Sequence, residues 1–214
     1  MTLKTLLLGA VATAAVAPAA FAERGSDGQV NIIYWQAPSI MPPFLSGGTK
    51  DVEAASLVIE PLARFNASGE MVPWLVEEIP TVSNGGVSED LTQITWKLKP
   101  GIKWSDGTDL TSADVKFTYE YCTHPEGGCA QVTKFEGVTG VETPDENTVV
   151  VTFDKATPYP YGPFVGGESP IIQAAQFGEC LGAKAPECTE ANFNPIGTGP
   201  FVVDEFKPND VITL

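Results

Sequence analysis

One stretch near the middle of the chain, residues 91–121, constrains the fold more than any other. Its first eight residues, LTQITWKL, place apolar side chains mostly at alternate positions, which predicts a strand. Turns follow at Pro100–Gly101 and at Ser105–Thr108, the second with a glycine suited to positive φ. Thr111 then caps a helix, with Asp114 where a capping box usually has glutamate. Strand, turns and helix in this order predict a mixed α/β fold.

The flanking sequence extends this α/β pattern in both directions. The expected elements are a buried strand at Val30–Trp35, a helix at Asp51–Ile59, a strand at Leu62–Phe65, a short helix from Pro73, and a hairpin of residues 138–142 with 148–153. The chain also holds 21 glycines and 18 prolines. We therefore expect many turns and loops between short elements.

The first 22 residues have the form of a secretory signal peptide. Lys4 supplies a positive charge, residues 6–17 form an uncharged apolar run, and Ala20-Phe21-Ala22 matches a cleavage site. The run is too short to span a membrane, which takes about 20 apolar residues. No cysteine follows the run to carry a lipid anchor. We expect export, removal of residues 1–22 and a soluble chain that starts at Glu23.

The charge of the chain disfavours one class of partner. The formal net charge is −15, and the acidic residues are scattered along the sequence rather than gathered in blocks. Such a chain repels nucleic acids and anionic membrane surfaces, so we expect no nucleic-acid partner. The 43% of hydrophobic residues is a globular value and argues against a disordered chain.

Four cysteines fall in two close pairs, Cys122 with Cys129 and Cys180 with Cys188. In an oxidising compartment they predict two disulfides, for which three connectivities are possible. Local pairing is favoured because each pair flanks a turn-rich loop. A metal site is disfavoured, since no C-x-x-C spacing occurs and His124 is the only histidine. We expect no metal and no cofactor.

Three motifs resemble those of one protein family. The longest is Leu98–Glu120 (LKPGIKWSDGTDLTSADVKFTYE), another is Glu60-Pro61-Leu62 with the turn and Pro-x-Leu stretch from Asn66, and the third is Pro195–Phe201 (PIGTGPF). In this order and spacing they resemble the family 5 solute-binding proteins, the oligopeptide-, dipeptide- and nickel-binding components of ABC importers. The resemblance runs from about Val30 to the end of the chain.

The resemblance implies an α/β fold of the type II periplasmic-binding-protein kind, in which two lobes close over a ligand. In that plan, residues 23–45 begin the first lobe, 46–168 form an inserted subdomain, and 169–214 return to the first lobe. Family members are much longer, and the chain stops inside the strand-like run from Asp210. We therefore expect a truncated first lobe, with the second lobe missing.

The resemblance also implies a function. It predicts the periplasmic substrate-binding component of an ABC transporter, which is not an enzyme, captures a peptide or another small solute, docks as a monomer on the membrane permease and has no catalytic residues. Ligand contacts are implied near residues 127–130 and, as the main candidates, at Ser46, Gly47, Gly48, Thr49, Gly166, Gly167 and Glu168. Without the second lobe, we expect residues 23–214 alone to bind peptide weakly or not at all.

Two alternatives from other classes remain open. The first is a secreted acidic hydrolase of the glycosidase kind, because 27 acidic residues can include a catalytic carboxylate pair. A serine hydrolase is disfavoured, since His124 stands in a Pro- and Gly-rich loop and the chain has no G-x-S-x-G. The second alternative is a stand-alone secreted interaction domain stapled by its disulfides.

Overall fold

The computed structural model describes residues 28–214, so the predicted signal peptide at residues 1–22 lies outside the described part. The chain divides into a unit that ends at Ile33 and a unit of residues 34–214. The prediction of a buried strand at Val30–Trp35 is wrong, because Ile33 is 96% exposed, Trp35 is 75% exposed and the run forms no strand. β propensity expresses packing against neighbouring strands, and no described strand pairs with this run.

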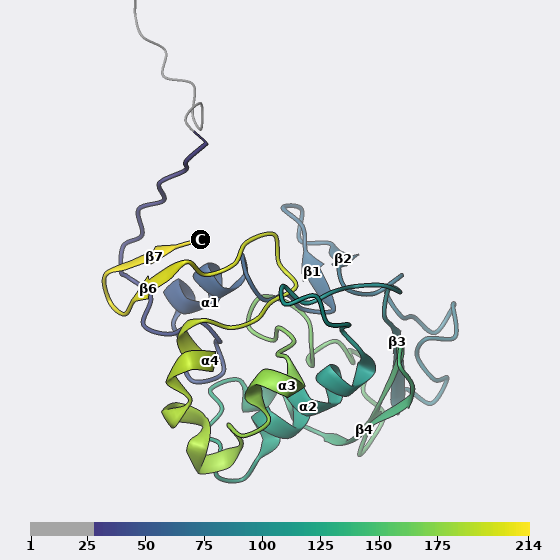
Figure 1. Cartoon of the computed structure of the whole chain (residues 1–214). Coiled ribbons are helices and arrows are strands. Elements are labelled where there is room, and N and C mark those ends of the chain that lie inside the picture. The colour runs from purple at the N-terminus through teal and green to yellow at the C-terminus, as the bar shows by residue number, and fades with distance from the viewer. Residues whose placement is uncertain (1–27) are drawn as a thin grey trace, which may run out of the picture. The chain divides into compact units, whose positions relative to one another are not determined.

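The second unit is built on a three-stranded antiparallel sheet. β3 (Gln93–Lys97) and β4 (Val138–Asp145) both pair with β5 (Thr148–Phe153), which lies between them. α2 (Ser112–Thr123) packs against β4 and β5 (Figure 1). The strand, the hairpin and the capped helix predicted from the sequence are confirmed.

The main apolar core lies between this sheet and α2. Ile94 and Trp96 of β3 are fully buried, while the residues between and beside them are exposed or half-buried. Val149 and Val151 of β5 are buried with them, and Tyr121 of α2 belongs to the same cluster. The alternation that predicted the strand is therefore the alternation of burial along it.

The cap of α2 also fastens a distant segment. The backbone N–H of Thr111 donates to Oδ2 of Asp114 at 2.9 Å, as the capping-box spacing predicted. Oδ1 of the same carboxylate accepts the N–H of Ala174 at 2.9 Å. One turn further on, the hydroxyl of Thr118 accepts the N–H of Ile172 at 3.1 Å. Residues 172–174 are thereby bound to the first turns of α2.

Shorter elements surround the main sheet. In chain order they are α1 (Thr49–Ala55), β1 (Ala63–Phe65), β2 (Met71–Pro73), η1 (Val132–Phe135), α3 (Ala174–Phe177), η2 (Gly182–Glu187), α4 (Thr189–Phe193), β6 (Glu205–Lys207) and β7 (Val211–Thr213). The helix predicted at Asp51–Ile59 is α1, which starts two residues earlier than predicted and ends four residues earlier. The helix predicted from Pro73 is wrong, because this proline ends β2, which pairs with β1 across the predicted turn at residues 66–69.

A second, smaller apolar cluster lies beside α1. Its buried members are Met41, Ala55, Val58 and Ile59, and the partly buried Val203 and Ile212 pack against them. The hairpin of β6 and β7 accordingly lies next to α1 (Figure 1). Segments from the two ends of the second unit thus share one core. None of the helices in the described part is long and apolar enough to cross a bilayer.

Candidate functional site

The three segments predicted to contact a solute all lie around α1. Residues 46–48 lead directly into the helix, and Gly48 is its N-cap. The loop at 127–130 reaches the same region, because the N–H of Ala130 donates to the carbonyl of Phe44 at 2.7 Å. Gly167 lies against the helix itself, where an added Cβ would be 3.1 Å from Cγ1 of Val52. The structure therefore brings these segments together, and their contact with a ligand stays a prediction.

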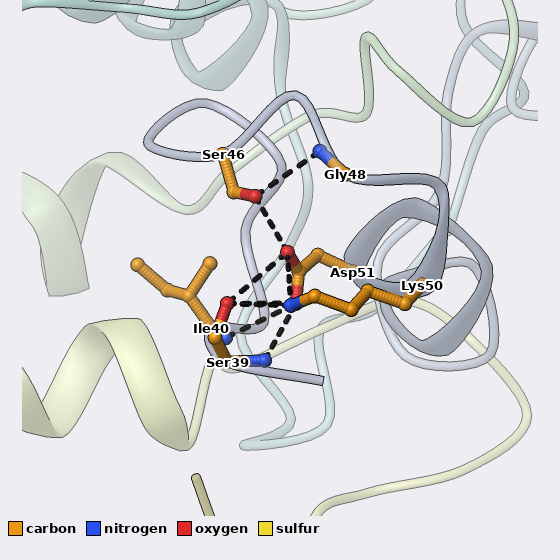
Figure 2. A network of polar contacts seen from close by, with 6 residues as sticks. All are labelled: Ser39, Ile40, Ser46, Gly48, Lys50 and Asp51. Carbon is orange, nitrogen blue, oxygen red and sulfur yellow. Dashed lines mark hydrogen bonds and ion pairs between the residues drawn. The ribbon is translucent and has the colours of Figure 1, made fainter. Parts of the chain in front are cut away.

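Asp51, in the first turn of α1, fastens the loop that precedes the helix (Figure 2). Its side chain is fully buried. Oδ2 accepts the hydroxyl of Ser46 at 2.5 Å, and Oδ1 accepts the backbone N–H groups of Ser39 at 2.6 Å and Ile40 at 3.3 Å. Nζ of Lys50 lies 3.0 Å from both carboxylate oxygens. We call Ser39, Ile40, Ser46, Lys50 and Asp51 the Asp51 network.

The Asp51 network holds a charged pair in a buried place. Burial raises the pKa of Asp51, but the hydrogen bonds from Ser46, Ser39, Lys50 and Ile40 outweigh it and keep the pKa below its ordinary value. Nζ of Lys50 also donates to the hydroxyl of Ser39 at 2.7 Å. The carboxylate is therefore an anion at neutral pH, and each surrounding group donates to it.

The hydrogen bonds of the Asp51 network limit which groups of the loop at residues 46–49 are free to bind a ligand. The hydroxyl of Ser46 donates to Asp51 and accepts the N–H of Gly48 at 3.1 Å, so its proton is already committed. Gly47 and Thr49 are exposed, and a Cβ added to Gly47 would meet nothing within 4 Å. The free surface of the loop is thus mostly backbone at Gly47 together with the exposed Thr49.

Glu168, the only charged residue among the predicted contacts, already has a partner. Its Oε2 lies 2.6 Å from Nζ of Lys134 in η1, and its side chain is 52% exposed. Two residues earlier, Gly166 has a φ of +82° and donates its N–H to the carbonyl of Ala63 at 2.9 Å. A solute amine that bound to Glu168 would have to share its carboxylate with Lys134 or displace the lysine.

Sequence reasoning did not identify the contacts of Glu60, a buried carboxylate. Its Oε1 accepts the indole N–H of Trp74 at 2.6 Å, and its Oε2 accepts the hydroxyl of Thr198 at 2.9 Å. The guanidinium of Arg64 lies 4.2 Å from the centre of the Trp74 ring and 3.7 Å from Glu60. Glu60 therefore joins two of the motifs that carry the family resemblance.

The glycines of the third motif allow the close contact that completes this junction. A Cβ on Gly197 would overlap the carbonyl oxygen of Val58, and the N–H of Gly199 donates to that same oxygen at 2.8 Å. The carbonyl of Gly197 in turn accepts the N–H of Ser105, which belongs to the longest motif, at 2.8 Å. The signal that could have revealed this junction is the pair of glycines, which marks close backbone approach.

The cysteines lie in the local pairs that their spacing favoured. The Cα atoms of Cys122 and Cys129 are 5.1 Å apart, and those of Cys180 and Cys188 are 5.8 Å apart. His124 joins the two loops, because its ring fills the space that a Cβ on Gly182 would occupy. Within residues 28–214, no group of three or more His, Cys, Asp or Glu side chains could hold a metal ion.

The predicted contacts include exposed residues, namely Gly47, Thr49 and Glu168. A recess of about 220 Å³ lies between residues 78–86 and β3, and none of the predicted contact residues lines it. We call the exposed part of the loops around α1 the open face of the second unit. An open face can hold a small solute firmly only when another surface covers it.

Comparison with known proteins defines the class. Residues 70–214 match the family described as bacterial extracellular solute-binding proteins, family 5 middle region. The chain belongs to this family, which confirms the resemblance seen in the sequence. The type II periplasmic-binding-protein fold is confirmed with it by the solved structures described below.

Individual relatives share a limited part of their length with this chain. A putative ABC transporter peptide-binding protein of Brucella ovis is 29% identical over 132 residues, which are 60% of this chain and 24% of that protein. The glutathione-binding protein GsiB of Escherichia coli is 26% identical over 206 residues, which are 95% of this chain and 36% of that protein. The chain thus spans about a quarter to a third of the length of these relatives.

Solved structures show the same fold. The oligopeptide-binding protein AppA from Bacillus subtilis, in complex with a nonapeptide, superposes with a TM-score of 0.69 at 22% identity, over 82% of this chain and 34% of that one. AgaA from A. tumefaciens R10, in complex with agropinic acid, gives a TM-score of 0.67 at 27% identity, over 82% of this chain and 33% of that one.

Proposed function

We propose that this chain supplies first-lobe residues of the substrate-binding component of a bacterial ABC importer, and that this component captures peptides. The family match over residues 70–214 carries the proposal. The Brucella relative described as a peptide-binding protein supports the choice of peptides over other solutes. We propose no catalytic activity, since the family is one of solute-binding proteins.

The mechanism follows from the proposed two-lobe plan. A hinge closes a second lobe over the open face at α1 and buries the solute between the lobes. A peptide offers regularly spaced backbone donors and acceptors, which pair with exposed backbone without requiring one sequence. The exposed loop at Gly47 and Thr49 fits that kind of pairing. The closed monomer then docks on the membrane permease.

The division into subdomains is also a proposal. We keep residues 169–214 in the first lobe, since the N–H of Gly199 bonds to the carbonyl of Val58 and the N–H of Met41 bonds to the carbonyl of Asn192. These contacts favour placing α1 in the first lobe as well. We therefore propose that the inserted subdomain starts after Ile59 rather than at residue 46, and extends to residue 168.

We further propose that the protein works in the periplasm with both local cysteine pairs oxidised. The Cα separations of both pairs fall within the usual disulfide range of roughly 4.4–6.8 Å. Peptide mapping of protein from the periplasmic fraction, without reduction, tests both statements. It should find an N-terminus at Glu23 and the two links Cys122–Cys129 and Cys180–Cys188. A retained Lys4 or crossed cysteine links would contradict the proposal.

Titration calorimetry tests the binding function. The protein is expressed from its natural reading frame and titrated with short peptides, with glutathione and agropinic acid as comparators. Peptides should bind with micromolar affinity or better. Residues 23–214 alone should bind at least about tenfold more weakly, because the contacts of the proposed second lobe are then missing. If glutathione or agropinic acid bound and the peptides did not, peptides would be refuted as the substrate class. Micromolar binding by residues 23–214 alone would refute the need for a second lobe.

A further inference from the structure

One buried carboxylate fastens both ends of the loop that precedes α1. Residues 39–48 contain no helix or strand, so no backbone ladder holds them in place. The start of the loop is bound through the N–H groups of Ser39 and Ile40, and its end through the hydroxyl of Ser46. All three donors converge on Asp51 (Figure 2). The middle of the loop is held separately, by the buried Met41 and Phe44 and their backbone hydrogen bonds. Asp51 is the side chain that ties the two ends of the loop to each other.

The negative charge of Asp51 is required for this arrangement. Its neighbours are all donors, and the ammonium of Lys50, whose side chain is only 9% exposed, balances the charge. Asparagine would place an NH₂ group against donors and would leave the lysine charge buried without a counter-ion. Such a loss is costly in a buried site, because an unmet donor or charge keeps its full desolvation penalty.

We propose that Asp51 is a positioning residue for solute capture, which holds the loop at residues 39–48 so that Gly47 and Thr49 face the bound solute. This inference rests on the proposed function. Asp51 itself is fully buried, so it is not exposed to a solute. It acts through the loop, whose ordering before binding lowers the entropy that capture must overcome.

Asp114 provides a matched control. It is also a buried aspartate in the first turn of a helix, and its carboxylate also accepts two backbone N–H groups, those of Thr111 and Ala174. It makes no hydrogen bond to residues 39–49. Asp114→Asn should therefore destabilise the fold without changing the loop beside α1.

The experiment measures peptide affinity and amide hydrogen exchange on the same variants of the protein expressed from its natural reading frame. Asp51→Asn should weaken peptide binding at least about tenfold and speed exchange at residues 39, 40 and 48, while β3 stays protected. Asp114→Asn should lower the melting temperature and keep the peptide Kd within about twofold of the wild-type value. Ser39→Ala, which removes one side-chain donor, should weaken binding about threefold and serves if Asp51→Asn does not fold.

Two results would overturn the inference while the wild-type protein binds peptides. One is an unchanged peptide Kd in Asp51→Asn, or in Ser39→Ala if only that variant folds, despite faster exchange in the loop. The other is an equal loss of affinity in Asp51→Asn and Asp114→Asn, which would indicate general destabilisation. If the wild-type protein bound no peptide, the proposed function would fail first, and the positioning role would fail with it.

Discussion

The sheet region and the region around α1 hold the chain in place by different chemistry. Between β3, β5 and α2, fully buried apolar side chains such as Trp96 and Val151 fill the core. Around α1 the apolar cluster is small, and two buried carboxylates, Asp51 and Glu60, accept donors from separate segments. Apolar packing is non-directional, whereas each hydrogen bond fixes a donor at one position. The polar region is therefore suited to hold irregular loops in defined shapes.

The largest expected effect comes from breaking the apolar region. Trp96→Ala should lower the free energy of unfolding by about 3–5 kcal/mol, because it removes a fully buried aromatic side chain and leaves a cavity. Guanidinium denaturation followed by circular dichroism measures the change. Trp35→Ala is the control, since that side chain is 75% exposed and should change stability by less than about 0.5 kcal/mol. Equal losses would contradict the assignment of the core.

A second substitution breaks the region around α1 through its backbone contacts. Gly197→Ala should destabilise by about 1–3 kcal/mol, because the added Cβ would overlap the carbonyl oxygen of Val58. Gly140→Ala in β4 is the matched control from the sheet region, where an added Cβ meets nothing within 4 Å. The same denaturation measurement should find Gly140→Ala neutral or slightly stabilising. If Gly197→Ala did not change stability, the backbone at Gly197 and Val58 would be able to move apart without cost.

Acid should affect the polar region through Asp51. Its pKa in the folded protein is below the unfolded value of about 3.9, so its contribution to stability is present above that pH. The contribution is lost as the pH falls through the folded pKa. Melting temperatures of the wild type and Asp51→Asn should therefore differ most near neutral pH and converge below about pH 4. A difference that stayed constant with pH would mean that the charge of Asp51 does not matter.

The smallest effect is expected at the surface of the candidate site. Glu168→Gln removes a solvated ion pair with Lys134 and should cost about 0.2–1 kcal/mol at low salt. Urea denaturation, which adds no ions of its own, at low and high ionic strength should show that this cost shrinks as salt is added. A salt-independent loss would indicate that the pair is more buried than its exposed fractions suggest.

Much of the sheet region could be predicted from sequence because its signals are local. The alternating residues Ile94 and Trp96 are two positions apart. The capping residues Thr111 and Asp114 are three positions apart. The strand predicted at Val30–Trp35 failed because a strand also needs a partner, which composition alone does not supply. The helix predicted from Pro73 failed because the preceding turn returned the chain into a second strand.

The candidate site could be predicted only in outline. The family resemblance indicated the loops that lie around α1, but not the carboxylates that fix them. The donors to Asp51 include Ser39, twelve residues away along the chain. No short-range pattern marks such a contact. An aspartate in a first helical turn is common, and in this chain only the fold showed that it is buried and bound to distant backbone.

The junction at Glu60 has a consequence for the order in which the chain is made. Thr198, which donates to Glu60, follows it by 138 residues. At roughly 5–20 residues per second, a ribosome adds that many residues in about 7–28 seconds. During that interval Oε2 of Glu60 and the carbonyl of Val58 lack the donors that Thr198 and Gly199 later supply. The segment from Val58 to Glu60 therefore cannot complete its hydrogen bonds until the PIGTGPF segment has been made.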